Sequence, residues 1–256
     1  MDTALNGVLF VCGSMVFSVL GLFLVRRRLS VEWLKRQHEV ASFFFLMIGT
    51  LYAVLIAFAI FVVWNEFQEA GTNLEREANE VGNLSRMAMG MPQPLHRDIQ
   101  SALLEYLNSV VDDEFPAMAN GNDSPRTWQA VQKLWDIYNG IEPDTPRMQA
   151  YYSESLKQLN ELSNSRRFRL FTSRGTVPDS LWDLLLGGGI MLIIFTYFFG
   201  HESIWSQAAM TAALAAVLAF SLFLVDSFDS PYSGVVRVTP DPFKIELTHI
   251  KARGAS

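Results

Sequence analysis

Cysteine and charge are both scarce in this chain of 256 residues. The one cysteine, Cys12, lies inside an apolar run, so the sequence excludes a disulfide framework and a metal site built from several thiolates. Charged residues make up only 18% of the chain, and the formal net charge is −6. Surfaces that bind nucleic acid are basic because they neutralise phosphates, so this charge balance argues against a nucleic-acid partner.

The motifs of common enzyme classes are missing as well. There is no glycine-rich phosphate loop, no nucleophile elbow and no pair of histidines at metal-ligand spacing. Asp183 is the one charged residue well inside an apolar run, and the sequence offers it no evident partner. We therefore expect neither an enzyme nor a bound cofactor or metal. The four histidines, which are far apart in the sequence, are His38, His96, His201 and His249.

Long apolar runs are what the chain has in abundance, since half of its residues are hydrophobic. A helix needs about 20 apolar residues to cross a hydrocarbon core about 30 Å thick. Four runs meet this length, at residues 7–25, 40–64, 181–199 and 207–225. We therefore predict an all-α membrane protein with four transmembrane helices. Trp residues favour the headgroup layer, and those at the edges of the runs are Trp33, Trp64, Trp182 and Trp205.

Positive charge follows the first run instead of preceding it. Arg26, Arg27 and Arg28 end this run, and no Lys or Arg comes before it, which favours a retained anchor over a cleaved signal peptide. Lys35 and Arg36 add to the same short link, so the positive-inside rule places the link in the cytoplasm. The central domain and the C-terminal tail are then predicted to lie outside the cytoplasm.

The region between spans two and three, residues 65–178, is predicted to be a helical extramembrane domain. Ser124 and Thr145 each precede a proline and mark helix starts, because a hydroxyl accepts a backbone N–H that the first turn leaves unpaired. The other predicted parts are residues 1–64 with spans one and two, residues 179–226 with spans three and four, and a tail at 227–256. In that tail, alternating apolar and polar residues over 235–238 and 243–250 predict a short β-hairpin.

Span two is the most informative segment for function. At about 100° per residue, small and weakly polar side chains share one face, and bulky ones such as Phe44 and Leu51 share the other. One interpretation is a helix-packing seam, since Gly49, Ala53 and Ala57 form a small-residue ladder. The other is the wall of a central pore in an oligomer. The candidate pore-lining residues are Glu39, Ser42, Leu46, Gly49, Thr50, Ala53, Ala57 and Ile60.

Charged residues beyond the two ends of span two also have two interpretations each. His38 and Glu39 either anchor and cap the helix or form rings at the inner mouth of a pore. The arginine run at 166–174 belongs either to a solvated or headgroup-binding helix face or to a vestibule that attracts anions. Glutamates on the helix that continues from span two carry the opposite charge. The sequence therefore does not decide whether a pore would select anions or cations. The selectivity or vestibule candidates are His38, Glu75, Arg166, Arg167 and Arg169.

The stretch from His38 to Leu55 resembles the opening signature of the bestrophin-like domain family, a group of mainly bacterial membrane proteins. The resemblance continues in order along nearly the whole chain. Its further motifs are Val81-Gly82-Asn83-Leu84, Met91-Pro92 to Tyr106, Glu114-Phe115-Pro116-Ala117-Met118, Val177-Pro178-Asp179-Ser180-Leu181-Trp182, Tyr197-Phe198-Phe199-Gly200 and Asp229-Ser230-Pro231-Tyr232-Ser233-Gly234.

This resemblance implies a four-span protein that assembles as bestrophins do. Those proteins are pentameric ion channels whose second spans line the pore and whose large domain lies between spans two and three. The implied function is a homo-oligomeric ion channel of the bacterial inner membrane, with the lipid bilayer and inorganic ions as its partners. The alternative is a non-conducting interaction or sensor protein whose outer domain binds a partner or ligand.

Two features depart from the bestrophin pattern. The bestrophin domain is cytoplasmic, whereas the charge bias here places the domain outside. Aromatic constrictions are typical of bestrophin pores, whereas span two presents small residues on the candidate face, with Phe43 and Tyr52 flanking them.

Overall fold

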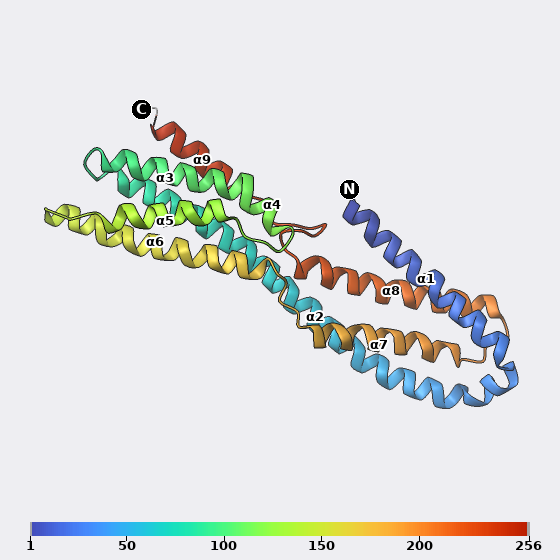
Figure 1. Ribbon diagram of the computed structural model, residues 1–256. Helices are drawn as coiled ribbons and strands as arrows, with labels where there is room; N and C mark the ends of the chain where they lie inside the picture. Colours follow the sequence, from blue (N-terminus) through green and yellow to red (C-terminus); the bar gives the residue numbers. More distant parts are fainter. Residues whose placement is uncertain (1, 255–256) are drawn as a thin grey trace. The chain divides into compact units, whose positions relative to one another are not determined.

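The computed structural model describes residues 2–254, with side chains over 5–253, and these residues form helices and no strand. The all-α prediction is therefore confirmed. Figure 1 labels the α-helices. In chain order the elements are α1 (Asp2–Arg28), α2 (Val31–Ala88), α3 (Leu95–Ser109), the π-helical turn η1 (Val110–Glu114), α4 (Phe115–Met118), α5 (Pro125–Asn139), α6 (Pro146–Thr172), α7 (Asp179–Tyr197), α8 (Ile204–Asp229) and α9 (Asp241–Gly254).

Four of these helices, α1, α2, α7 and α8, are long and apolar enough to cross a membrane, which confirms the prediction of four spans. Helix α2 has 58 residues and is therefore about 87 Å long at 1.5 Å per residue. A hydrocarbon core takes up only about 30 Å of that length. The apolar run of α2 ends at Trp64, so only the first part of this helix is apolar enough to cross a membrane.

The first compact unit comprises Met1–Asn65 and Thr176–Asp229. Close helix contacts in it depend on tyrosine and glycine. The Tyr52 hydroxyl of α2 donates to the Leu185 carbonyl of α7 at 3.0 Å, and a Cβ added at Gly188 would lie 2.7 Å from the Tyr52 ring. Gly188 and Gly189 both face Tyr52, so the absence of their side chains lets α2 and α7 approach closely.

The second compact unit comprises Glu66–Gly175 and Ser230–Ser256. Its core is built from one face of each helix, with Leu84 from α2, Leu103 from α3, Leu134 from α5 and Leu162 from α6 all fully buried. The two predicted helix caps are confirmed. The Ser124 hydroxyl accepts from the Thr127 N–H at 3.3 Å, and the Thr145 hydroxyl accepts from the Met148 N–H at 3.2 Å.

The predicted C-terminal β-hairpin is wrong, because residues 241–254 form helix α9. Phe243 and Ile250 are seven residues apart, lie on one helical face and are both buried in the core of the second unit. Ile245, which a strand would place beside Phe243, is 57% exposed. The apolar residues of this segment fit the periodicity of a helix as well as that of a strand. Burial of the helical face in the core of the second unit decides for the helix.

Candidate functional site

The membrane half of α2 uses one face for packing within the chain. Its buried residues are Leu34, Ala41, Tyr52, Ala59 and Val63, which recur at helical spacing. Ala59 and Val63 pack in a cluster with residues of α7 and α8, and Tyr52 packs in another. This seam differs from the small-residue ladder in the sequence interpretation. Tyr52 belongs to the seam and does not flank an open surface.

The candidate pore face lies beside that seam and is largely uncovered in the single chain. Ala53 and Ala57 are exposed, and an added Cβ at Gly49 would make only an ordinary contact, 3.7 Å from Leu192. Leu46 is 68% exposed. Exposed candidates are Glu39, Leu46, Thr50, Ala53 and Ala57, while Ser42, Gly49 and Ile60 are half-buried at the margin. The ladder is therefore free to face a second copy or water.

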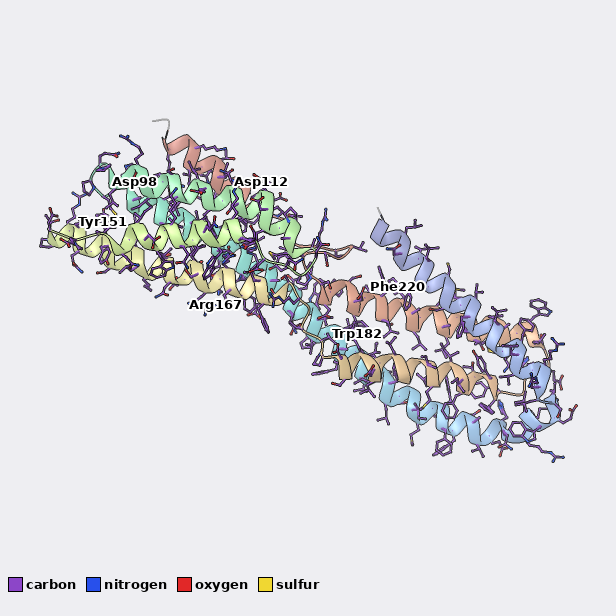
Figure 2. All side chains as sticks on the ribbon, in the orientation of Figure 1. Asp98, Asp112, Tyr151, Arg167, Trp182 and Phe220 are labelled. Carbon is purple, nitrogen blue, oxygen red and sulfur yellow. The ribbon has the colours of Figure 1, made fainter. Side chains whose placement is uncertain are left out.

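The neighbouring surfaces of the spans have a different composition. Large apolar side chains such as Phe17 on α1 and Phe220 on α8 are exposed, as lipid-facing positions are. Figure 2 labels Phe220. On α2 the bulky exposed residues Leu51 and Phe58 lie roughly opposite the small face. Thr50 donates its hydroxyl proton to the Leu46 carbonyl of its own helix at 2.8 Å. The small, weakly polar strip is thus distinct from the lipid-like surface around it.

The basic segment around the α1–α2 connection contacts the segment around the α7–α8 connection. Lys35 forms an ion pair of 2.8 Å with Glu202, and Arg26 donates to the Gln207 side chain at 3.0 Å. The His38 ring packs edge-on against Phe199, with the ring centroids 5.7 Å apart. A pocket of about 540 Å³ lies here, lined by Lys35, His38, Phe199, Gly200, His201, Glu202 and Met210. His38 thus contacts Phe199 just after the end of α7, and both His38 and the neighbouring Glu39 are exposed.

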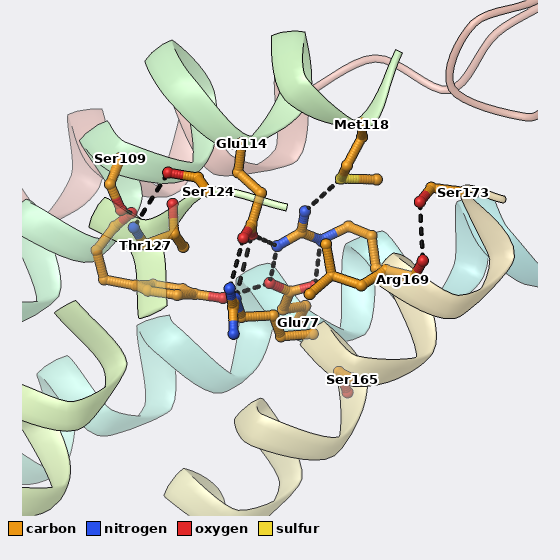
Figure 3. Close-up of polar contacts among 12 residues, drawn as sticks. Glu77, Ser109, Glu114, Met118, Ser124, Thr127, Ser165, Arg169 and Ser173 are labelled. Carbon is orange, nitrogen blue, oxygen red and sulfur yellow. Dashed lines mark hydrogen bonds and ion pairs between the residues drawn. The ribbon is translucent and has the colours of Figure 1, made fainter. Parts of the chain in front are cut away.

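A buried ion cluster lies at the centre of the second unit (Figure 3). Arg169 of α6 donates from Nε to Glu77 Oε2 at 2.8 Å and from Nη2 to Glu77 Oε1 at 2.9 Å. The same Nη2 donates to Glu114 Oε2 at 2.7 Å. All three side chains have no solvent exposure. Arg166 closes the cluster by donating to Glu114 at 2.5 and 3.2 Å.

The surroundings of Arg169 keep its charge inside the bundle. Burial opposes the charged form, but the carboxylates of Glu77 and Glu114 raise the pKa of Arg169 well above its ordinary value. The rings of Phe115 and Phe243 lie 5.6 and 5.7 Å from its guanidinium carbon. Two carboxylates and two guanidinium groups leave the cluster formally neutral. Its helices are therefore joined without an uncompensated buried charge.

A π-helical turn positions Glu114. Pro116 has no N–H to bond the carbonyl four residues earlier, so the α-helical pattern cannot continue through this segment. The chain forms η1 instead, which ends at Glu114, and Glu114 and Phe115 are both buried. Tyr106, two turns earlier, donates its hydroxyl proton to Glu77. Burial, followed by the charge of Glu77, raises the pKa of Tyr106 well above its ordinary value.

The structure separates the predicted vestibule candidates. Arg166 and Arg169 point into the bundle and are paired there, so neither a solvated face nor an open vestibule describes them. Arg167 is exposed (Figure 2), and so is Glu75. Sequence reasoning missed the ion cluster, because its members come from α2, η1 and α6. The one signal available was a pair of arginines three residues apart on a helix of otherwise amphipathic character.

The fold defines a class of protein: a multi-pass helical membrane protein with a helical bundle between its second and third spans. The Bestrophin-like domain matches residues 12–243, and the chain belongs to that family. The prediction made from the sequence motifs is therefore confirmed. No curated protein matches the chain.

Solved structures show the same fold. A variant of a bacterial bestrophin homologue from Klebsiella pneumoniae is 12% identical, with a TM-score of 0.72, and the alignment covers 96% of this chain and 99% of that one. Another variant of the same protein has a TM-score of 0.70 at the same identity and coverage. A further crystal structure, of a membrane protein with the substitution P143A, is 13% identical with a TM-score of 0.66, and the alignment covers 94% of this chain and 96% of that one.

Proposed function

We propose that this protein is a homo-oligomeric ion channel in which α2 lines the pore. The observation that carries the proposal is the small, weakly polar strip of α2, with Thr50, Ala53 and Ala57, which stays exposed in the described part of the chain. Family membership supports it, because the bestrophins that the sequence resembles are pentameric ion channels. In an oligomer, this strip would face either a helix of a neighbouring copy or the water in a central pore. No enzymatic activity is part of this proposal.

The candidate strip has the features of a pore wall. Small side chains leave room along an axis, and Thr50 hydroxyls can replace part of an ion's hydration shell. Leu46 and Ile60 are the largest apolar residues on it, and rings of them would form hydrophobic constrictions, which gate by dewetting. Glu39, an exposed residue one turn beyond Lys35, would form a charged ring at one mouth. Glu75 and Arg167 are the exposed candidates for a vestibule.

Ion flux through the purified oligomer in liposomes tests the proposal. Ala53→Trp places a large ring on the candidate strip, and we expect it to abolish flux while the oligomer keeps its size. Leu51→Trp is the matched control, since Leu51 is 66% exposed on the bulky side of the same helix, and it should conduct like the wild type. A well-folded oligomer that passes no ion would instead favour a non-conducting interaction or sensor protein.

The proposed orientation places the second unit outside the cytoplasm of a bacterial inner membrane. Its support is the basic link with Arg26 and Lys35, whose partners Gln207 and Glu202 lie in or next to the other short link. Asn122→Cys, in a Cys12→Ser background, tests it because Asn122 is exposed between α4 and α5. Labelling of intact cells by an impermeant maleimide is expected. Labelling only after the membrane is opened would place this unit in the cytoplasm, as in bestrophins.

A further inference from the structure

Glu80 of α2 is a buried carboxylate with an incomplete set of partners. The residue is 3% exposed, and Ser165 donates to its Oε1 at 3.1 Å. Its Oε2 accepts no hydrogen bond from any described residue. The carboxylates of Glu77 and Glu114, which are buried in the same bundle, are paired with arginine. Glu80 therefore has an acceptor atom that the described chain does not satisfy.

This carboxylate lines a polar pocket of about 380 Å³ between α2 and α6. Three of the lining side chains are glutamates and one is an arginine, so the pocket carries an excess of negative charge. The remaining lining groups are amides and a hydroxyl, whose oxygens are hard ligands. The Asn83 and Gln158 oxygens already accept from Arg86 and Asn83, respectively. The lining residues are Thr72, Glu75, Arg76, Asn79, Glu80, Asn83, Gln158 and Glu161. Arg76 forms no ion pair with Glu80 among the described residues.

We propose that this pocket binds a monovalent inorganic cation, Na⁺ or K⁺, through the free oxygen of Glu80. Hard oxygen donors and the excess negative charge favour a hard cation over a soft metal. Among the side chains of residues 5–253, no three carboxylate, imidazole or thiol groups stand close enough to hold a metal ion. That arrangement disfavours Ca²⁺, which takes about six to eight oxygens with several from carboxylates. One carboxylate, amide oxygens and water suit a singly charged ion.

The neighbours of Glu80 add negative charge to the site and hold the carboxylate in place. Asn73 donates to the Ser165 carbonyl at 2.8 Å, which holds the α6 backbone beside Glu80. The pKa of Glu80 is raised to about 7, chiefly by burial; the Ser165 hydrogen bond and the charge of Arg76 lower it, and the charges of Glu77 and Glu161 raise it. A proton therefore competes with a cation for the same oxygen near neutral pH. Raising the pH frees the carboxylate and favours the cation.

Thermal unfolding of the full-length protein in detergent tests the site without measuring conduction. The protein is melted at about pH 8 in NaCl, in KCl and in N-methylglucamine chloride of equal ionic strength. We expect Na⁺ or K⁺ at about ten times its dissociation constant to raise the midpoint by about 3–6 °C over N-methylglucamine. The shift should saturate with concentration, and it should vanish at about pH 5, where a proton occupies Glu80.

Two variants decide whether Glu80 is the ligand. Glu80→Gln should lose the cation-dependent shift, whereas Glu142→Gln, which changes a residue outside the pocket, should keep it. No shift in the wild type, or an equal shift in Glu80→Gln, would overturn the proposal. Should Glu80→Gln fail to fold, Glu161→Gln removes a nearby charge and should raise the half-saturating concentration several-fold. An unchanged value would overturn the proposal. None of these results depends on ion flux.

Discussion

Arg169 on α6 and Glu77 on α2 form a two-pronged ion pair, at 2.8 and 2.9 Å, with neither side chain exposed to solvent. The two residues are 92 positions apart in the sequence. Both ends of this pair must be present, because a buried charge that loses its partner cannot be solvated by water. The second unit therefore depends on both residues for its stability.

Arg169→Met should destabilise the second unit strongly. It leaves Glu77 and Glu114 buried without their shared guanidinium, at an expected cost of about 3–5 kcal/mol. Lys133→Met is the matched control, since its 2.7 Å pair with Glu105 is solvent-exposed and worth about 0–1 kcal/mol. Unfolding of the purified protein followed by circular dichroism compares the two. Equal losses from the two substitutions would show that burial adds nothing to the Arg169 pair.

The stability of the second unit should fall as pH rises through neutrality. Burial raises the pKa of Glu80 from 4.5 to about 7, so the folded chain holds this proton more tightly than the unfolded chain does. The contribution is complete below about pH 4.5 and is lost as pH rises through about 7, up to about 3 kcal/mol. Without Na⁺ or K⁺, Glu80→Gln should therefore be more stable than the wild type at about pH 8 and equal to it near pH 5.

Denaturant midpoints measured across this pH range in N-methylglucamine chloride check the prediction. Glu142→Gln, which changes a carboxylate outside the Glu80 pocket, should follow the wild type throughout. A wild-type curve parallel to that of Glu80→Gln at every pH would show that Glu80 does not titrate in this window.

Gly188→Ala should disturb the packing of α2 on α7, because its Cβ would lie 2.7 Å from Cδ2 of the Tyr52 ring. Overpacking of this kind costs about 1–3 kcal/mol. Gly187→Ala is a close control, since an added Cβ there meets nothing within 4 Å. Thermal denaturation in detergent should rank the wild type and Gly187→Ala together, with Gly188→Ala below them. A Gly188→Ala protein as stable as the control would mean that the Tyr52 ring moves aside without cost.

Leu46→Thr should increase ion flux if the candidate strip lines the pore. A hydroxyl-bearing side chain keeps a narrow apolar ring wet, which lowers the barrier to an ion. Leu24→Thr on α1 changes a similarly exposed leucine, 67% against 68%, away from that strip. Flux measured in liposomes should rise several-fold for the first variant only. A rise in both would point to a general leak and not to a widened pore.

The fold could be predicted from the sequence where the pattern of apolar residues fits only one kind of secondary structure. Four apolar runs, with Trp64 and Trp182 at their edges, were enough to place the membrane helices. The hydroxyl caps at Ser124 and Thr145 placed two helix starts, because capping is local chemistry. Helix α9 could not be predicted, since Phe243, Ile245 and Leu247 also fit a strand, and the choice depends on which face finds a core.

The candidate site was harder to predict for the same reason. The periodicity of α2 separated a small face from a bulky one, but Tyr52 and Ala41 showed their packing role only once the other spans were in place. Arg166 and Arg169 read as a basic surface because their partners Glu77 and Glu114 are distant in the sequence. Spacing along one helix cannot reveal a pairing that three segments make together.

The π-helical turn η1 lets the chain hold one residue more than an α-helix would over the same turn, without turning the residues that follow. Removing one residue here, such as the exposed Asp112, would return the segment to ordinary α-helical spacing and leave Glu114 directed toward Arg169. Removing a residue from the regular helix α3 would instead rotate Glu114 by about 100° relative to the rest of that helix. A relative can therefore be one residue shorter at η1 and still keep the cluster. An alignment of this segment should place a single-residue gap at η1 and not within α3.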